Sequence, residues 1–353
     1  MSTSPIRLAT IGSSAITERF LDAVRHTEGV TYGAAYSRDL DRAHAFGEPR
    51  GATAFYDDLG ALAQSDEVDA VYVASPNGLH AEQALTMIAG GKHVLIEKAL
   101  ASNERAGREV LSAAAERGVV CLEAMRNLHT QGFANIQRTL PELGAISQAS
   151  LRFGKVTSRI ARLNAREYVS QFDPELSEGA LMDIGVYVVE LAVALFGRPQ
   201  SVLASLLARE LAWEAKEGRD IIDVAGSLSL RYADKIVDLS YSKVGDDLVD
   251  SQVMGDGGTL LIPNANVPRD IALVRHEDKG MVYATVSGER ETIKADVPDN
   301  DMICELSLFR DAVRGDAAAR EAVAHFAQVT LCSLNIMDEA RRQAGVRFPA
   351  DKA

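Results

Sequence analysis

The sequence predicts an α/β protein with two sheets: a doubly wound parallel sheet in the N-terminal part, and a large, mostly antiparallel open sheet in a C-terminal α+β part. Short apolar runs alternate with helical patterns over the first third of the 353-residue chain, which is typical of a parallel sheet with helices on both faces. Later runs alternate in polarity, as half-exposed strands do. We place the domain boundary after residue 124, giving domains over 1–124 and 125–353.

The first domain alternates strands with helices. Continuous apolar runs such as "AVYVAS" and "HVLIE" indicate strands that are buried on both faces. We expect the strands at Arg7–Ile11, Thr31–Tyr36, Ala70–Ala74, His93–Ile96 and Val119–Leu122. Apolar residues at helical spacing predict the helices between them at Ile16–Arg25, Leu40–Phe46, Leu79–Gly90 and Glu104–Arg117.

The second domain has one central helix, which we expect over Ala180–Phe196, closed by Gly197. Its strands are expected at Ala145–Phe153, Val202–Arg209, Val224–Tyr232, Lys235–Ser242, Thr259–Ile262, Ala272–Arg275 and Val282–Val286. Two helices, Met302–Val313 and Ala318–Ala344, end the chain. The last of them can pack back on the first domain.

Composition and charge exclude several classes of partner. The net charge of −13 argues against nucleic acid, because no basic patch offsets the repulsion from phosphates. We find no apolar stretch near the roughly 20 residues that cross a bilayer, and no signal-peptide pattern at the N-terminus. Cys121, Cys304 and Cys332 indicate free thiols, and no ligand spacing predicts a metal site. We therefore expect a cytoplasmic protein with neither a nucleic-acid nor a membrane partner.

The stretch "IGSSAITERF" follows the first strand and opens the first helix. Gly12 suits a tight strand-to-helix turn, after which the backbone N–H groups of Ser13, Ser14, Ala15 and Ile16 can hold a pyrophosphate. The usual motif has two further glycines, and Ser14 replaces the second of the three. The turn alone therefore leaves two interpretations open, a variant dinucleotide site and a turn that binds nothing.

The end of the second strand favours the dinucleotide site. In this fold an acidic residue there binds the ribose hydroxyls of NAD, whereas an arginine accepts the 2′-phosphate of NADP. Ser37 and Arg38 supply a hydroxyl and a guanidinium at this place, which predicts NADP. Asp39 keeps NAD as an alternative, and Arg38 has a second interpretation as a surface residue that starts a helix.

A third stretch, "ASPNGLHAEQA", ends another strand at the sheet edge where ligands of such folds bind. Ser75, Pro76 and Asn77 form the expected turn and are predicted to contact the cofactor. His80 can contact it as well, or can simply pack in the first turn of the helix that Leu79 begins.

The sequence resembles the Gfo/Idh/MocA family of oxidoreductases, whose N-terminal dinucleotide fold has a strand that ends as this one does, in Glu97-Lys98. Four further stretches support the resemblance in the same order along the chain: "EAMRNLH" at 123–129, "GALMDIGVY" at 179–187, "FRDAVRG" at 309–315 and the closing "DEARRQAGVRFP". The resemblance covers nearly the whole chain and implies a Rossmann-type cofactor domain followed by a substrate-binding and oligomerisation domain.

The sequence departs from the family pattern at three places. Ser14 lies within the glycine motif, and Ala99 replaces a proline that often follows a cis peptide bond. Ser177-Glu178-Gly179 stands where relatives often have three glycines, which can alter how closely a substrate approaches the helix.

The resemblance implies an active site of a lysine, an aspartate and a histidine or tyrosine, at the positions of Lys98, Asp183 and Tyr187. The tyrosine makes the chain similar to glucose–fructose oxidoreductase, the NADP-dependent xylose dehydrogenases and the dimeric dihydrodiol dehydrogenases. We also assign Glu97, Lys98 and Asn127 to the cofactor site.

The residue types suit hydride transfer from an alcohol, which also requires removal of the hydroxyl proton. Asp183 and Tyr187 are four residues apart on a predicted helix and can face one cleft. Lys98 lies at the carboxyl end of a parallel strand, and its ammonium is expected to lower the pKa of Tyr187 from about 10 by a unit or more. The alternative is that Tyr187 is a core aromatic residue and Asp183 a surface residue.

The leading hypothesis is an NADP-dependent oxidoreductase, with NAD as the alternative cofactor, acting on a secondary alcohol or hemiacetal carbon of a sugar, cyclitol or vicinal diol. Two alternatives stay open: a non-catalytic regulator that binds NAD(P), and an enzyme that retains its cofactor and cleaves glycosides through transient oxidation. Candidate substrate-lining residues are Arg126, Asn127, His129, Arg159, Arg162 and Arg166.

The strands Val224–Tyr232 and Lys235–Ser242 alternate in polarity, so one face of their sheet is free of helices. A part-apolar exposed face usually meets a partner. We therefore expect a homodimer or homotetramer that forms through this sheet, as the family resemblance also implies.

Overall fold

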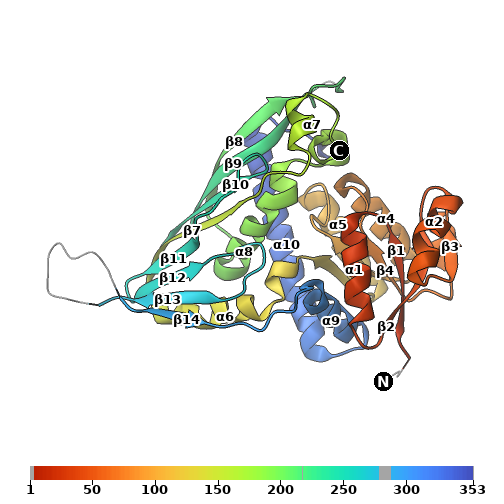
Figure 1. Cartoon of the computed structure of the whole chain (residues 1–353), viewed down its shortest axis with the longest axis horizontal. Coiled ribbons are helices and arrows are strands. Elements are labelled where there is room, and N and C mark those ends of the chain that lie inside the picture. Colours follow the sequence, from red (N-terminus) through yellow and green to blue (C-terminus); the bar gives the residue numbers. More distant parts are fainter. Residues whose placement is uncertain (1–3, 217, 278–287, 353) are drawn as a thin grey trace.

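The computed structural model describes residues 4–216, 218–277 and 288–352 and contains two sheets (Figure 1). The first is a six-stranded parallel sheet in the order β3-β2-β1-β4-β5-β6. The direction of winding reverses between β1 and β4, which creates the edge crevice where ligands of doubly wound folds bind. The strands are β1 (Ile6–Ile11), β2 (Val30–Tyr36), β3 (Ala54–Tyr56), β4 (Ala70–Val73), β5 (His93–Glu97) and β6 (Cys121–Ala124).

Helices connect these strands: α1 (Ala15–Arg25), α2 (Leu40–Gly47), α3 (Leu59–Gln64), α4 (Asn77–Ala89) and α5 (Glu104–Arg117). The sequence does not predict β3 or α3, because so few residues carry too little periodicity to mark an element. The expected start of α4 at Leu79 is also wrong, since the helix begins two residues earlier. The predicted parallel sheet and its other helices are confirmed.

The second sheet has eight strands in the order β14-β13-β12-β11-β7-β10-β9-β8, and only the β7–β10 pair is parallel. The predicted mostly antiparallel sheet is therefore confirmed. The sequence does not predict β11 or β14, and the predicted strand Val282–Val286 lies outside the described residues. The strands are β7 (Ile146–Gly154), β8 (Ser201–Glu210), β9 (Ile221–Arg231), β10 (Ile236–Ser242), β11 (Ser251–Gly255), β12 (Gly258–Ile262), β13 (Ile271–Arg275) and β14 (Arg290–Ile293).

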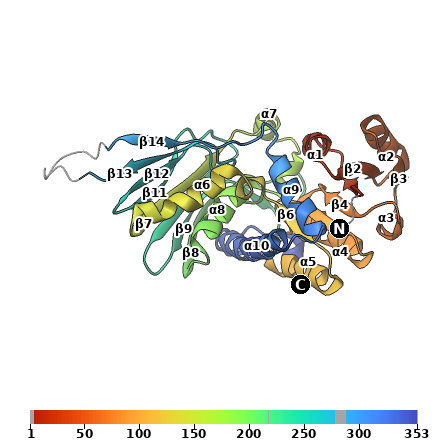
Figure 2. The same cartoon turned by 90° about the horizontal axis from the view of Figure 1, so that it is seen from below.

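The helices of the second part lie on the side of this sheet that faces the first sheet (Figures 1 and 2). Helix α8 packs on β7 and β10, α6 on β13, and α10 on β8. In the described chain no helix covers the opposite face of the sheet (Figure 1). The helices are α6 (Gln131–Thr139), α7 (Ile160–Asn164), α8 (Val186–Phe196), α9 (Met302–Val313) and α10 (Ala317–Ala344).

Helix α10 joins the two sheets, because it contacts α5 and β6 as well as α8. Glu123 of β6 accepts hydrogen bonds from the hydroxyl of Thr330 on α10 and, at 2.7 Å, from the backbone N–H of Leu100. Glu190 of α8 is buried as well, and burial raises its pKa, with the Glu123 carboxyl group adding to the effect. The hydrogen bond between Thr330 and Glu123 therefore ties α10 to the first sheet.

The segment Pro174–Phe196, which ends with α8, corrects the expectation that no apolar stretch is long enough to cross a membrane. By length and composition alone it qualifies, with a mean hydropathy of 1.9. However, 78% of its most apolar part is buried inside the protein. A helix that is apolar on all sides is expected in the core of a large protein, and α8 lies between the large sheet and α10.

Candidate active site

Gly12 forms the turn between β1 and α1. Its φ is +109°, a conformation that favours glycine, and a Cβ atom here would lie 2.4 Å from the backbone oxygen of Ala74. The ends of β1 and β4 therefore approach too closely for a side chain. This turn brings the start of α1 to the carboxyl edge of the sheet, which is where a pyrophosphate binds in such folds.

The start of α1 is available to an anionic ligand. Ser13, Ser14 and Ala15 are exposed, and Ile16 is partly buried. Ser14 occupies the N-cap position, and its hydroxyl makes no capping hydrogen bond within the described chain. The backbone N–H groups of such a helix start lack intrahelical acceptors, so together with this hydroxyl they fit a pyrophosphate. Ser14 thus replaces glycine without removing the donors of the site.

At the end of β2, Arg38 and Asp39 have different surroundings. Arg38 is exposed and makes no hydrogen bond or ion pair with any residue that the structure describes. The carboxylate of Asp39 caps α2, accepting a hydrogen bond from the backbone N–H of Arg42 at 2.9 Å. The backbone N–H of Ser37 donates to the carbonyl oxygen of Tyr56 at 3.1 Å, which holds the strand end in place. The free guanidinium is therefore the group left to bind a ligand here.

The turn before α4 links the two parts of the protein. The hydroxyl of Ser75 donates to Gln83 at 2.7 Å, and Pro76 is exposed. Asn77 is buried, and its side-chain amide donates to the carbonyl oxygen of Ser177 at 3.2 Å. This turn therefore lies at the sheet edge as predicted, and the Asn77 side chain contacts the second domain.

His80 packs inside the protein, as the alternative interpretation has it. It is fully buried, with Nδ1 2.9 Å from the carbonyl oxygen of Ala99 and Nε2 2.7 Å from that of Ser75. Burial lowers the pKa of His80. With no exposed area, its side chain offers no surface to a cofactor. The Lys98–Ala99 peptide bond beside it is cis.

Lys98 follows β5 and binds Asp183. Its Nζ donates at 2.7 Å to Oδ1 of Asp183 and at 2.7 Å to the Asp183 carbonyl oxygen. Burial lowers the pKa of Lys98, but Asp183, Tyr187 and Glu97 together outweigh this, so the net pKa lies above its ordinary value. The neighbouring Glu97, which we assigned to the cofactor site, is buried and accepts a hydrogen bond from Tyr72 inside the sheet.

A second lysine, which the sequence analysis missed, binds the same aspartate. Lys243 follows β10, its side chain is 5% exposed, and its Nζ donates to Oδ2 of Asp183. Burial raises the pKa of Asp183, but Lys98 and Lys243 outweigh it and hold the pKa well below its ordinary range. Asp183 is therefore ionised at neutral pH and is too acidic for a general base.

Glu178 is the fourth acidic or basic group at this place, after Lys98, Asp183 and Lys243. Burial raises its pKa to about 7, and the Asp183 carboxylate adds to the effect, while Lys98 and Lys243 oppose it. The residue lies in the Ser177-Glu178-Gly179 stretch that departs from the family pattern. Its carboxyl group therefore changes charge within the physiological pH range.

Tyr187 is buried on α8 beside two cations. Its ring centroid lies 5.7 Å from Lys98 Nζ and 5.7 Å from the guanidinium carbon of Arg126, and its ring meets that of Phe153 edge-on. The expected lowering of its pKa is wrong. Burial raises the pKa of Tyr187 by more than Arg126 and Lys98 lower it. The phenol therefore holds its proton at neutral pH.

The helix start that carries Asp183 is irregular. Residues Leu181–Gly185 form a π-helical turn before α8, so the predicted α-helix from Ala180 is wrong in its first turn. The buried carboxylate of Asp223 on β9 accepts a hydrogen bond from the backbone N–H of Leu181 at 2.7 Å. Such turns are frequent at functional sites, because they shift the direction of side chains. Here the turn places Asp183 within reach of both lysines.

Of the candidate substrate-lining residues, Arg126 lies at the site and Asn127 supports it. Arg126 contacts Tyr187 and pairs with Asp301 at 3.3 Å. Asn127 is fully buried, and its amide donates to the carbonyl oxygens of Tyr187 at 3.2 Å and Ala265 at 3.1 Å. Both amide hydrogens are thus used inside the protein, so Asn127 positions α8 and presents no surface to a cofactor.

The structure does not bring the other four candidates to Tyr187. His129 packs edge-on against Phe326, and burial lowers its pKa to about 4. Arg162 is exposed and pairs with Glu167 at 3.0 Å. Arg159 and Arg166 are exposed around the short helix α7.

Comparison with known proteins decides the family. The family model described as an oxidoreductase family with an NAD-binding Rossmann fold matches residues 6–125, and that of the GFO/IDH/MocA C-terminal domain matches residues 142–261. The NADP-dependent scyllo-inositol 2-dehydrogenase of Bacillus subtilis is 34% identical over 99% of this chain and 100% of its own length. The chain belongs to the Gfo/Idh/MocA family.

Other members of the Gfo/Idh/MocA family share this architecture. A trans-1,2-dihydrobenzene-1,2-diol dehydrogenase of Xenopus tropicalis is 26% identical over 89% of both chains. A 3-ketoreductase from Actinomadura kijaniata, solved with NADP and TDP-benzene, matches 98% of this chain and 99% of its own at a TM-score of 0.78 and 24% identity. The predicted family, fold class and oxidoreductase activity with a nicotinamide cofactor are confirmed.

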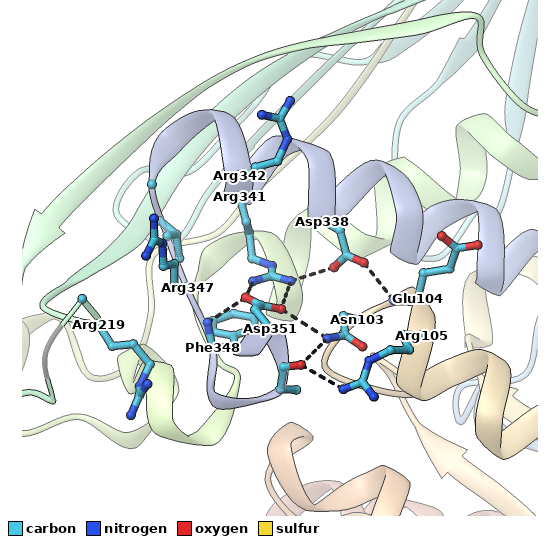
Figure 3. Close-up of a pocket in the computed structure, with 14 residues that line it drawn as sticks. Asn103, Glu104, Arg105, Arg219, Asp338, Arg341, Arg342, Arg347, Phe348 and Asp351 are labelled. Carbon is cyan, nitrogen blue, oxygen red and sulfur yellow. Dashed lines mark hydrogen bonds and ion pairs between the residues drawn. The ribbon is translucent and has the colours of Figure 1, made fainter. Parts of the chain in front are cut away.

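A cavity of about 560 Å³ lies away from this Gfo/Idh/MocA site, where the C-terminal tail docks on the start of α5 (Figure 3). Arg341 on α10 is its central residue and binds Asp338 and Asp351, each at 2.6 Å. Asn103 and Arg105 donate to the tail carbonyl oxygen of Ala350 at 3.1 Å and 3.2 Å. These bonds occupy the central groups of the cavity, so we interpret it as the anchor of the tail.

Proposed function

We propose that this protein is an NADP-dependent oxidoreductase that interconverts a secondary alcohol and a ketone on a polyhydroxylated ring, such as a cyclitol or a sugar. One observation carries the proposal: the protonated phenol of Tyr187 lies beside the ammonium of Lys98, which Asp183 holds in place at 2.7 Å. A regulator that only binds a dinucleotide has no need for such a proton donor and its paired cation.

The groups at the end of β2 support NADP. Arg38 is free to pair with a 2′-phosphate, whereas Asp39 is engaged as the cap of α2. Gly12 and the N–H groups that follow it fit the pyrophosphate. When bound, the dinucleotide supplies the hydride or accepts it.

The residues of this chain handle the proton. In the reducing direction the Tyr187 hydroxyl gives its proton to the carbonyl oxygen of the substrate, which becomes the hydroxyl oxygen of the product. The positive charges of Lys98 and Arg126 stabilise the phenolate that Tyr187 becomes. In the oxidising direction the phenolate takes up the hydroxyl proton of the substrate. Asp183 stays ionised throughout and keeps Lys98 in position.

The relatives support the class of substrate, since the Bacillus subtilis relative is named for a cyclitol and the Xenopus tropicalis relative for a vicinal diol. The test is a screen of cyclitols, aldoses and diols with NADP and with NAD, followed at the absorbance of the reduced nicotinamide. We expect turnover of at least one cyclitol or aldose with NADP. Lack of turnover for every compound would overturn the proposal, and a cofactor that stays bound through purification would favour transient oxidation instead.

We further propose a cytoplasmic homodimer or homotetramer. The free thiols of Cys121, Cys304 and Cys332 support a reducing compartment. The uncovered face of the large sheet supports assembly, because Leu203 and Leu207 on β8 are 72% and 55% exposed there.

A further inference from the structure

We propose that Lys243 is a substrate-binding residue, and that with Glu178 it selects substrates bearing a hydroxyl group on the carbon next to the reacting carbon. The inference rests on the proposed function and adds a specificity element to it. An ammonium has three N–H donors, and among the described residues only Oδ2 of Asp183 accepts from this one. The other two donors therefore lack an acceptor in the part of the chain that the structure describes.

Burial makes these unused donors significant. The Lys243 side chain is 5% exposed, and its Nζ lies 4.9 Å from the ring centroid of Phe172. A buried ammonium with two N–H donors unpaired is costly, and an aromatic face offsets only part of that cost. A bound oxygen atom of a ligand would supply the missing acceptor. The opening is at Asp183, whose side chain is 31% exposed.

Asp183 is surrounded by more positive than negative charge. Lys98 already pairs with the carboxylate, at 2.7 Å to Oδ1, so the second cation, Lys243, is not needed to hold Asp183 ionised. The two lysines carry two positive charges and Asp183 one negative charge. One positive charge is therefore in excess when Glu178 is protonated. Glu178 precedes Gly179, whose carbonyl oxygen accepts a hydrogen bond from the backbone N–H of Asp183 at 3.1 Å, so Glu178 belongs to the same cluster. The charges of Lys98, Lys243 and Asp183 also influence its ionisation.

Lys243 and Glu178 together supply a donor and an acceptor. One hydroxyl group can accept a hydrogen bond from Lys243 and donate its hydrogen to the Glu178 carboxylate. Lys98 and Tyr187 serve the reacting oxygen under the proposed mechanism. The arrangement therefore fits two adjacent oxygen atoms, which is the chemistry of a vicinal diol or an α-hydroxy ketone.

The test compares two substrates in the wild type and in Lys243→Met: a polyol that the wild type oxidises, and its deoxy analogue without the hydroxyl group beside the oxidised carbon. A site that hydrogen-bonds a hydroxyl discriminates strongly against the analogue lacking it. We expect Lys243→Met to reduce the ratio of kcat/KM for the polyol to kcat/KM for its deoxy analogue at least tenfold, mainly by raising the KM for the polyol. NADPH affinity, measured by fluorescence titration, should stay within twofold. Lys155→Met removes an exposed lysine next to the same strand end and should leave the preference intact.

Other outcomes would overturn the proposal. If Lys243→Met slows both substrates by the same factor, Lys243 only positions Asp183. If Lys243→Met does not fold, Glu178→Gln decides, because it should reduce the same preference and an unchanged preference would contradict the inference. If the wild type oxidises no polyol at all, the proposed function fails and this inference fails with it. If Lys243→Met and Glu178→Gln are both active and keep the wild-type preference, the proposed function stands and only this inference is overturned.

Discussion

The ammonium of Lys98 is bonded twice to Asp183, at 2.7 Å to Oδ1 and at 2.7 Å to the backbone carbonyl oxygen. Two acceptors on one residue fix the direction of the lysine side chain, and the carboxylate keeps it charged. Because its pKa lies above its ordinary value, Lys98 stays protonated and is a poor proton donor to the substrate. The proton in the proposed reaction must therefore come from another group, and Tyr187 is the one beside it.

The first prediction concerns this ion pair. Asp183→Asn keeps the shape of the side chain but leaves Lys98 and Lys243 without a negative partner. We expect turnover to fall at least tenfold and the free energy of unfolding to fall by roughly 1–3 kcal/mol, less than for a fully buried pair because Asp183 is partly exposed. Denaturant unfolding and initial rates check both values. Wild-type stability in this variant would show that the two lysines do not depend on the charge.

The second prediction concerns pH. Burial raises the pKa of Glu178 to about 7, so the group is neutral below that pH and negative above it. If the carboxylate accepts a hydrogen bond from the substrate, 1/KM for a polyol should rise as the pH increases through about 7. Glu178→Gln cannot ionise and should remove this inflection, which a pH series of initial rates would show. An inflection that persists in Glu178→Gln would assign it to another group.

The third prediction concerns cofactor choice. Arg38→Ala should weaken NADP binding much more than NAD binding, because only NADP carries the 2′-phosphate. Fluorescence titration of the two reduced cofactors measures both affinities. Arg42→Ala removes another exposed arginine, on the adjacent helix α2, and is the matched control. Equal losses for both cofactors in Arg38→Ala would remove Arg38 from phosphate recognition.

Local patterns in the sequence predict the parallel sheet, the turn at Gly12 and the place of Lys98 at the end of a strand. They do so because a strand, its turn and the following helix are contiguous in the sequence. They do not predict Lys243, whose partner Asp183 is 60 residues away in the sequence. The shift in the pKa of Tyr187 has the wrong predicted sign for a related reason. A neighbouring cation can be inferred from a motif, whereas the burial that outweighs it depends on packing by distant segments.

The fourth prediction concerns assembly. Leu203 lies on β8 with 72% of its surface exposed, on the sheet face that no helix of the described chain covers. If this face forms the dimer, Leu203→Asp buries a charge in the interface and should shift light scattering at micromolar concentration toward the monomer. Leu40→Asp, at a 41% exposed leucine of the first domain, should leave the mass unchanged. A wild type that is already monomeric would contradict the assembly proposal.

The last prediction concerns the proton donor. Tyr187→Phe keeps the ring and its packing against Phe153 but removes the hydroxyl group. Turnover should fall by about 10²–10⁴, the usual loss for a general acid or base, while NADPH affinity stays nearly unchanged. In the wild type, oxidation should still accelerate at alkaline pH, because burial raises the pKa of Tyr187 and oxidation needs the phenolate.

The coupling between Tyr187 and Lys98 separates this mechanism from one in which the lysine acts alone. Lys98→Ala should also cost turnover heavily, since it removes one of the two cations that stabilise the phenolate. The double variant Tyr187→Phe with Lys98→Ala should be little slower than the slower single variant, because groups that serve one step have non-additive effects. Multiplicative losses would mean that the two residues act in separate steps. A Tyr187→Phe enzyme with most of its activity and an unshifted pH profile would assign the proton transfer to another group.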